Sequence, residues 1–132
     1  MKTILVIEDD RLVRSNIKTL LEEEGFKVFT TADGEEGLSL TKEIKPDLII
    51  CDVMMEGLNG YEVLKKLSED PETAIIPFIF LTARVEKEDM RMGMELGADD
   101  YIFKPFEADT LLRAIQIRLN KYERIRAEVV DK

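Results

Sequence analysis

The fold of this protein is decided by residues 3–10, which read TILVIEDD. A short apolar run rich in β-branched residues is typical of a strand, and here it leads directly into three acids. A second run, LIIC at residues 48–51, is followed by Asp52. Because this second run is apolar without interruption, we expect a strand that is buried on both faces, as in a parallel sheet.

Units of strand and helix alternate along the whole chain. The expected strands are 3–7, 27–31, 48–51, 77–81 and 100–103, and the expected helices are 12–21, 33–44, 61–67, 86–96 and 107–122. Alternation at this spacing favours a parallel sheet with helices on both of its faces. We therefore predict a doubly wound α/β domain with five parallel strands and five helices.

The composition restricts the functions that need to be considered. The 132 residues fit one compact domain, and an apolar content of 45% is sufficient for a core. The formal net charge of −9 argues against direct binding to nucleic acid or to an anionic membrane. A single cysteine, Cys51, excludes an intramolecular disulfide and favours a cytoplasmic setting. We expect Cys51 to be a small buried apolar residue.

Chemically distinctive residues follow four of the five expected strands, at the carboxyl ends where parallel sheets place their sites. They are Glu8, Asp9 and Asp10 after the first strand, Asp52 after the third, Thr82 after the fourth and Lys104 after the fifth. Clustered carboxylates repel one another and are stabilised by a cation. Because the chain contains no histidine, oxygen ligands and therefore Mg²⁺ are favoured.

This set of residues suits phosphoryl transfer. A carboxylate beside a partly coordinated Mg²⁺ can attack phosphorus and form an acyl phosphate. An ammonium and a hydroxyl, from Lys104 and Thr82, would then neutralise the oxygens of the transferred group. We therefore predict that Asp52 accepts a phosphoryl group.

Five short motifs in this sequence occur in the order and at the spacing of a known family. They are IEDD at 7–10, DVMMEGLNG at 52–60, LTA at 81–83, GADDY at 97–101 and KPF at 104–106. Together they resemble the receiver domain of two-component response regulators. The resemblance covers residues 1–120 and implies the flavodoxin-like strand order 2-1-3-4-5. Residues 121–132 are expected to extend the last helix, as a linker to an output domain or as a dimerisation segment.

The resemblance also assigns a phosphoacceptor and a metal site. Asp52 matches the phosphoacceptor, and Glu8 and Asp9 match the acidic pair, with Asp9 as the more direct Mg²⁺ ligand. Met54 is expected to bind the ion through its backbone carbonyl. Mn²⁺ is expected to substitute for Mg²⁺. Asp10 is interpreted first as a helix cap.

Further roles follow from the same resemblance. Lys104 matches the lysine that contacts the phosphoryl group, and its peptide bond to Pro105 is expected to be cis. Thr82 matches the switch hydroxyl, and Tyr101 matches the aromatic residue that changes rotamer with it.

Met54 and Arg84 occupy the positions that influence how long the phosphoryl group survives. A large apolar side chain and a long cation would shield phosphorus from water, so we expect slow self-hydrolysis. The chain departs from the family pattern at Glu56, where many relatives have proline.

The resemblance implies that a sensor histidine kinase or a histidine phosphotransfer protein donates the phosphoryl group. It implies a signalling domain rather than an enzyme, although such domains catalyse their own phosphorylation and dephosphorylation. The family's output surface corresponds to the helix 86–96, the strand 100–103 and the last helix. A homodimer is expected through this surface or through the C-terminal helix, with no direct contact with nucleic acid or membrane.

Several interpretations stay open at this level. A receiver-like domain can dock partners without phosphorylation, and a Mg²⁺-dependent phosphohydrolase uses related chemistry but often has a second aspartate where this chain has Met54. A flavin module would need a hydroxyl-rich loop after the first strand, where this chain has acids.

Two further sequence features each have two explanations. The methionines of helix 86–96 suit either the core or a surface that binds a partner. The apolar seam that continues to Ile125 and Val129 suits either pairing with another helix or a frayed helix end. The methionines concerned are Met90, Met92 and Met94.

Overall fold

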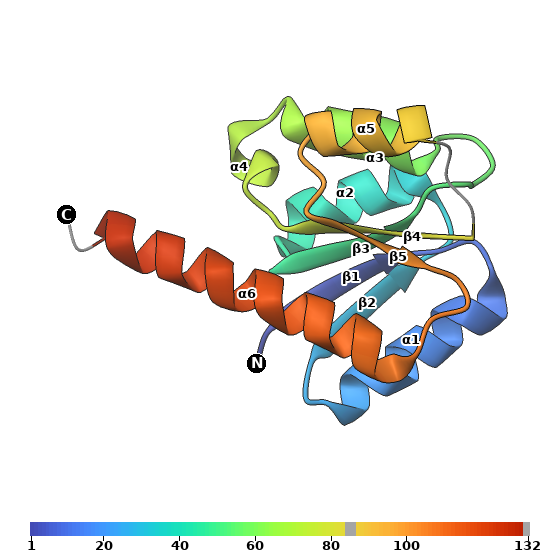
Figure 1. Cartoon of the computed structure of the whole chain (residues 1–132), viewed down its shortest axis with the longest axis horizontal. Helices are drawn as coiled ribbons and strands as arrows, with labels where there is room; N and C mark the ends of the chain where they lie inside the picture. The colour runs from blue at the N-terminus through green and yellow to red at the C-terminus, as the bar shows by residue number, and fades with distance from the viewer. Residues whose placement is uncertain (84–86, 131–132) are drawn as a thin grey trace.

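The structure is a computed structural model that describes residues 1–83 and 87–130. Its strands are β1 (Thr3–Ile7), β2 (Lys27–Thr31), β3 (Leu48–Asp52), β4 (Phe78–Thr82) and β5 (Asp100–Phe103). Its helices are α1 (Arg11–Glu23), α2 (Gly34–Ile44), α3 (Gly60–Ser68), α4 (Pro71–Ala74), α5 (Lys87–Glu95) and α6 (Ala108–Val130). All five strands are parallel, in the order β2-β1-β3-β4-β5, which confirms the predicted sheet (Figure 1).

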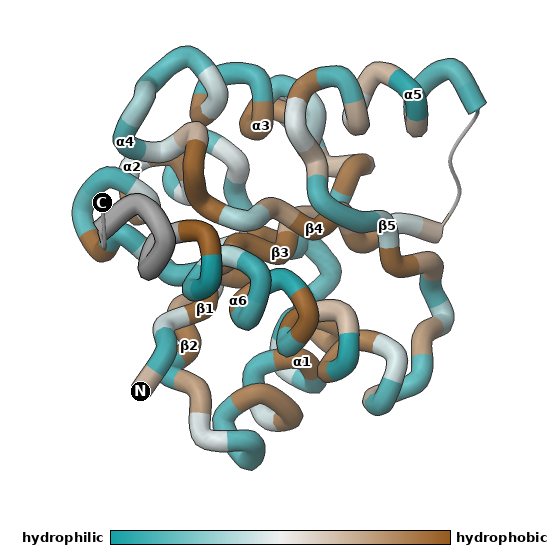
Figure 2. The backbone as a smooth tube through the Cα atoms, turned by 60° about the vertical axis from the view of Figure 1, so that its left-hand side comes forward, coloured by the Kyte–Doolittle hydropathy of each residue, from teal (hydrophilic) through white to brown (hydrophobic). Residues whose placement is uncertain are grey.

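Apolar side chains fill both faces of the sheet. Figure 1 shows α1 and α6 on one face and α2, α3 and α5 on the other. Along β1, Ile4 and Val6 pack with α1 and α6, whereas Leu5 and Ile7 pack in the second apolar cluster with residues of α3. The tube in Figure 2 is therefore hydrophobic along the central strands and largely hydrophilic along the outer helices. Burial on both faces explains the uninterrupted apolar runs in the central strands β1, β3 and β4.

The register of the strands brings their carboxyl ends to one edge. Ile7 of β1 pairs with Cys51 of β3, and Asp52 of β3 pairs with Leu81 of β4. Glu8, one residue beyond β1, therefore lies at the level of Asp52. The fold thus supplies the shared edge that the predicted site requires.

One helix was not predicted. Asp70 and Pro71 indicate a helix end, yet α4 begins directly there. The Asp70 side chain accepts a hydrogen bond from the backbone N of Glu72 at 2.9 Å, and Pro71 occupies the first helical position, which needs no N–H donor. The five predicted helices are present, and α4 is a short additional helix, because the same dipeptide follows α3 and starts a further turn.

Helix α6 continues past residue 122 to Val130, in the segment where an extension of the last helix is expected. Leu119 is buried and Tyr122 is partly buried, whereas Ile125 is 51% exposed, so the apolar seam on the domain is not continued at Ile125. The side chain of Val129 lies outside the described part of the chain. Beyond Tyr122, the Glu123 carboxylate forms an ion pair with Lys2 at 2.5 Å. The end of α6 extends away from the body of the domain (Figure 1). In the described part of the chain, no helix combines the length and apolar character needed to cross a membrane.

Candidate functional site

Three carboxylates meet at the carboxyl edge of the sheet. One oxygen atom from each of Glu8, Asp9 and Asp52 lies within 4.8 Å of the others. Glu8 is completely buried, Asp52 is nearly so, and Asp9 is exposed. Carboxylates at this separation repel one another unless a proton or a cation intervenes. The donor set and its partial exposure fit a hard divalent ion such as Mg²⁺.

The expected lysine lies beside these acids. The Lys104 ammonium contacts the Glu8 carboxylate and lies 3.5 Å from Oδ2 of Asp52. Its backbone N donates a hydrogen bond to the carbonyl of Thr82 at 2.8 Å, which fixes the start of the loop after β5. The peptide bond between Lys104 and Pro105 is cis. The structure thus places the Lys104 ammonium against the two buried acids.

Burial and neighbouring charges shift the pKa values at this site. Burial, together with the adjacent Asp52 side chain, raises the pKa of Glu8 to about 8. Desolvation and the charge of Asp52 raise the pKa of Asp9. Burial lowers the pKa of Lys104, but contact with Glu8 and the charge of Asp52 outweigh this effect and raise it. Near neutral pH, Glu8 therefore binds a proton that a divalent cation would displace.

Cys51 agrees with the prediction of a small apolar residue. It is fully buried within the cluster formed by β1, β3 and α3. Burial, with the nearby charge of Asp52, raises the pKa of its thiol well above the ordinary value. The thiol is therefore poorly suited to act as a nucleophile.

The loop after β3 orients the Asp52 side chain. Oδ1 of Asp52 accepts a hydrogen bond from the backbone N of Met54 at 3.2 Å. Gly60 donates its N–H to the carbonyl of Val53 at 2.9 Å, and a Cβ atom at position 60 would lie 2.4 Å from the carbonyl oxygen of Asp52. Only glycine permits this approach. The side chain of Met54 is 71% exposed beside the acceptor.

The two residues expected to form the switch lie on adjacent strands. Thr82 is completely buried at the end of β4. Tyr101 of β5 is 9% exposed, and its hydroxyl lies 3.2 Å from the carbonyl oxygen of Met90 and 3.4 Å from that of Asp89. The hydroxyl of Tyr61 is 3.5 Å away. Tyr101 therefore points inward, beneath α5.

Gly93 is a site residue that the sequence analysis missed. It is the buried residue of α5, and a Cβ atom there would lie 1.9 Å from the hydroxyl oxygen of Tyr101. A glycine inside a helix costs about 1 kcal/mol relative to alanine, which was the one signal available in the sequence. Which side chain needs the space is visible only in the fold.

The remaining predicted residues differ in where they lie. Arg84 falls outside the described residues. Met90 is partly buried against the cluster that contains Tyr101, whereas Met92 and Met94 are exposed on α5. The methionines thus divide between core and surface.

Asp10 caps α1, as expected. Its side chain accepts a hydrogen bond from the backbone N–H of Val13 at 3.0 Å.

Comparison with known proteins identifies the family. A family model described as the response regulator receiver domain matches residues 4–116. The chain belongs to this family. In this receiver domain the carboxylates of Glu8, Asp9 and Asp52 and the Lys104 ammonium lie together at the carboxyl edge of the sheet.

Curated relatives include whole response regulators. The receiver domain is 40% identical over 124 residues to the transcriptional regulatory protein AfsQ1 of Streptomyces coelicolor, covering 94% of this chain and 54% of that protein. It is 35% identical over 128 residues to the DNA-binding response regulator MtrA of Mycobacterium tuberculosis, covering 97% and 55%. The chain thus spans about half the length of the curated relatives it matches.

Solved structures support the same fold. A CheY-like receiver domain protein from Methanospirillum hungatei is 29% identical, with a TM-score of 0.89 and coverage of 94% of this chain and 98% of that one. The receiver domain of the sensor histidine kinase PA1611 from Pseudomonas aeruginosa is 27% identical, with a TM-score of 0.83 and coverage of 90% and 98%. That structure contains a magnesium ion coordinated in its active site cleft.

These relatives give no support to one expectation. We predicted that nucleic acid is not a direct partner, but MtrA is named as a DNA-binding protein and AfsQ1 as a transcriptional regulator. The prediction rested on a net charge of −9, which describes this acidic domain alone.

Proposed function

We propose that this receiver domain accepts a phosphoryl group on Asp52 from a phosphohistidine of a sensor histidine kinase or a histidine phosphotransfer protein. The observation that supports the proposal is the surroundings of the Asp52 carboxylate. Oxygens of Glu8 and Asp9 lie within 4.8 Å, and the Lys104 ammonium lies 3.5 Å from Oδ2. Acids for a divalent cation and a cation for a phosphoryl group thus surround one acceptor.

The transfer proposed at this acceptor is a direct displacement. A carboxylate oxygen of Asp52 attacks phosphorus and forms a P–O bond, while the bond between phosphorus and the donor's imidazole nitrogen breaks. The electron pair stays with the imidazole, which takes a proton from solvent. Lys104 and Thr82 stabilise the oxygens of the transferred group. The protein domain thus catalyses its own modification and acts as a signalling switch rather than as a turnover enzyme.

The proposed cofactor is Mg²⁺, with Mn²⁺ as a substitute. Side-chain oxygens of Glu8, Asp9 and Asp52 and the backbone carbonyl of Met54 would bind it. When bound, the ion supplies Lewis-acid stabilisation of the phosphoryl oxygens. The histidine-free oxygen donor set supports this choice, as does the magnesium ion in the related PA1611 receiver domain.

The proposed output is a change at the surface formed by α5, β5 and α6. The added charge would draw Thr82 toward the phosphoryl group and alter the packing of Tyr101. Phe103 and Ile117 are exposed large apolar residues on this surface, which suits binding of a partner or of a second copy. We propose residues 121–132 as a linker to an output domain or as a dimerisation segment, and a cytoplasmic location.

Treatment with acetyl phosphate and Mg²⁺, followed by intact mass measurement, tests the proposal. The wild type should gain one phosphoryl group, and Asp52→Asn should gain none. Glu56→Gln is a matched control, because this exposed acid follows Asp52 in the same loop and should leave labelling intact. Labelling of Asp52→Asn to the wild-type extent would refute the assignment.

Labelling, together with assays of kinase binding and of phosphomonoester turnover, separates the alternatives. A wild type that binds its kinase but is never labelled would favour a receiver-like docking module. Continuous turnover of small phosphomonoesters would favour a phosphohydrolase, although Met54 stands where such enzymes often have a second aspartate.

The lifetime of the acyl phosphate is a separate expectation. The exposed Met54 side chain beside Asp52 would shield phosphorus from water, together with Arg84. Phosphorylated wild type should therefore lose its label slowly, and Met54→Ala should lose it faster. Complete loss from the wild type within seconds would contradict this expectation.

A further inference from the structure

The acidic pair lies in a loop whose backbone is fixed at both ends. On the sheet side, the N–H of Glu8 donates to the carbonyl of Thr31 at 3.0 Å. On the helix side, the Asp10 side chain accepts from the N–H of Val13 at 3.0 Å, and its carbonyl accepts from the N–H of Arg14 at 2.9 Å. Between these ends, the carbonyl groups of residues 8 and 9 lie beyond the strand and before the helix.

The side chain of Arg14 contacts both of these carbonyls. Its Nη1 lies 2.8 Å from the carbonyl oxygen of Glu8 and 3.4 Å from that of Asp9. Arg14 is half-buried against the domain. A planar guanidinium on α1 therefore bridges two consecutive peptide groups. These are the peptide groups of the two residues whose carboxylates face Asp52.

The electrostatics of α1 do not explain an arginine at this position. The amino end of a helix favours negative charge. Arg14 lies near the amino end of α1, and the first turn contains no acid that would pair with it, so the helix dipole does not favour an arginine there. Within the part of the chain that the structure describes, the side-chain hydrogen bonds of Arg14 go to the carbonyls of Glu8 and Asp9. Its contribution is thus made to the loop.

We propose that Arg14 is a positioning residue that holds the backbone of residues 8 and 9 so that their carboxylates bind a divalent cation with Asp52. This inference rests on the proposed function, in which that cation is Mg²⁺. Groups that orient metal ligands typically change metal affinity by about 10–100-fold when they are removed. Arg14 acts through peptide groups and does not itself bind the ion.

Two substitutions separate positioning from charge. Arg14→Lys keeps the positive charge but loses the planar group that reaches both carbonyls, whereas Arg14→Gln also removes the charge. If Arg14 positions the loop, both variants bind Mg²⁺ more weakly, by about tenfold. If Arg14 acted only through its charge, Arg14→Gln would bind Mg²⁺ more tightly, because repulsion between the two cations would be lost, and Arg14→Lys would be unchanged.

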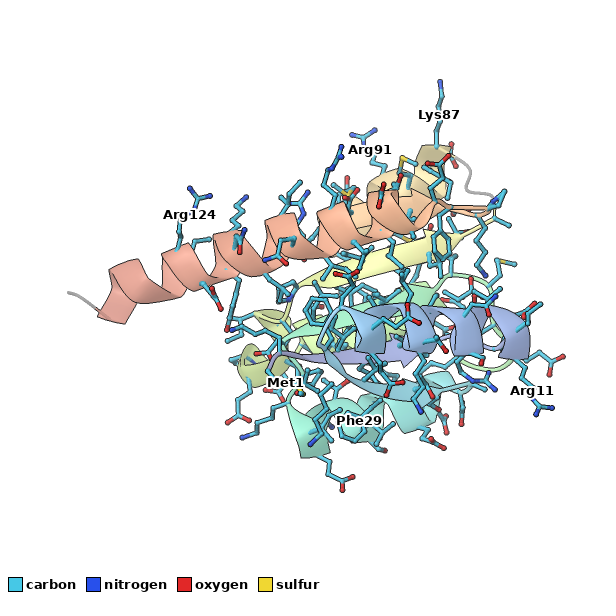
Figure 3. The ribbon with its side chains drawn as sticks, turned by 90° about the horizontal axis from the view of Figure 1, so that it is seen from below. Met1, Arg11, Phe29, Lys87, Arg91 and Arg124 are labelled. Atoms are coloured by element: carbon cyan, nitrogen blue, oxygen red, sulfur yellow. The ribbon has the colours of Figure 1, made fainter. Side chains whose placement is uncertain are left out.

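Arg11 provides a matched control on the same helix. It is exposed, and Figure 3 shows its side chain pointing away from the domain at the end of α1. Arg11→Gln removes one positive charge near the acidic loop without removing a hydrogen bond to it. Its Mg²⁺ affinity should equal or slightly exceed that of the wild type.

The test is calorimetric titration of each purified protein with Mg²⁺ alone, together with thermal unfolding with and without Mg²⁺. Both Arg14 variants should lose affinity and show a smaller Mg²⁺-induced rise in Tm, while Arg11→Gln retains both. Wild-type affinity or tighter binding in Arg14→Gln would overturn the inference and leave the proposed function intact. A wild type that does not bind Mg²⁺ would overturn both. If Arg14→Gln does not fold, Arg14→Lys decides by the same criteria.

Discussion

The packing of Gly93 against Tyr101 gives a prediction in which two effects have opposite signs. Within a helix, Gly→Ala ordinarily stabilises by about 0.8–1 kcal/mol. At position 93 the new Cβ atom would lie 1.9 Å from the hydroxyl of Tyr101 and 3.0 Å from Cε1 of Tyr61. The Tyr101 ring, which also packs on Phe80 with ring centroids 5.1 Å apart, would have to move.

The size of the destabilisation follows from the contacts that the displaced Tyr101 ring would lose. Separating the Tyr101 hydroxyl from the carbonyls of α5 costs about 1 kcal/mol, and the displaced packing costs about 1–3 kcal/mol more. After subtraction of the helix preference, Gly93→Ala should lower the free energy of unfolding by about 1–3 kcal/mol. Urea unfolding followed by far-UV circular dichroism measures this change, because the fold contains both helices and strands.

A double-mutant cycle tests the cause. In Tyr101→Phe the hydroxyl is absent, so adding Gly93→Ala should cost at least about 1 kcal/mol less than it does in the wild type. A Gly93→Ala protein as stable as the wild type would refute the reasoning. Additive effects of the two substitutions, to within about 0.5 kcal/mol, would refute it equally.

Three further predictions concern the site and its loop. Without Mg²⁺, the free energy of unfolding should fall as the pH rises from 4.5 to about 8, because folded Glu8 binds its proton more tightly than unfolded Glu8. Glu8→Gln should flatten that dependence, and calorimetry in different buffers should detect proton release when Mg²⁺ binds the wild type near neutral pH. Lys104→Met should bind Mg²⁺ more tightly in the same calorimetry, because an ammonium 3.5 Å from Asp52 is lost, yet acetyl phosphate should label it more slowly. Asn59 caps α3, because its side-chain oxygen accepts a hydrogen bond from the N–H of Glu62 at 3.0 Å. Asn59→Ala should therefore lower the unfolding free energy measured in urea by about 1 kcal/mol.

Each of these predictions has a clear contrary result. A pH dependence of unfolding that is the same in Glu8→Gln and the wild type would assign the effect to other groups. Weaker Mg²⁺ binding in Lys104→Met would show that the lysine supports the ion rather than competing with it. An unchanged stability of Asn59→Ala would mean that solvent replaces the cap.

Much of the fold could be predicted from the sequence because the patterns that indicate strands and helices are local. Continuous apolar runs of about five residues become strands that are buried on both faces, and residues such as Asp52 and Lys104 directly follow them. Parallel strands then bring these ends to one edge whatever the details of packing. The sequence therefore determined the sheet, its site edge and the residue types there. It also left α4 undetected, because Asp70-Pro71 both ends and begins helices.

Contacts between distant parts of the chain were decided only by the tertiary structure. Nothing near Gly93 reveals that the hydroxyl of Tyr101 fills its space, and nothing near Arg14 reveals that two loop carbonyls lie within its reach. The raised pKa of Glu8 likewise depends on burial beside Asp52, which no local pattern encodes. Local propensity and spacing fix which groups reach the site. The distances between those groups, their burial and the space beside a residue such as Gly93 arise only when separate elements pack together.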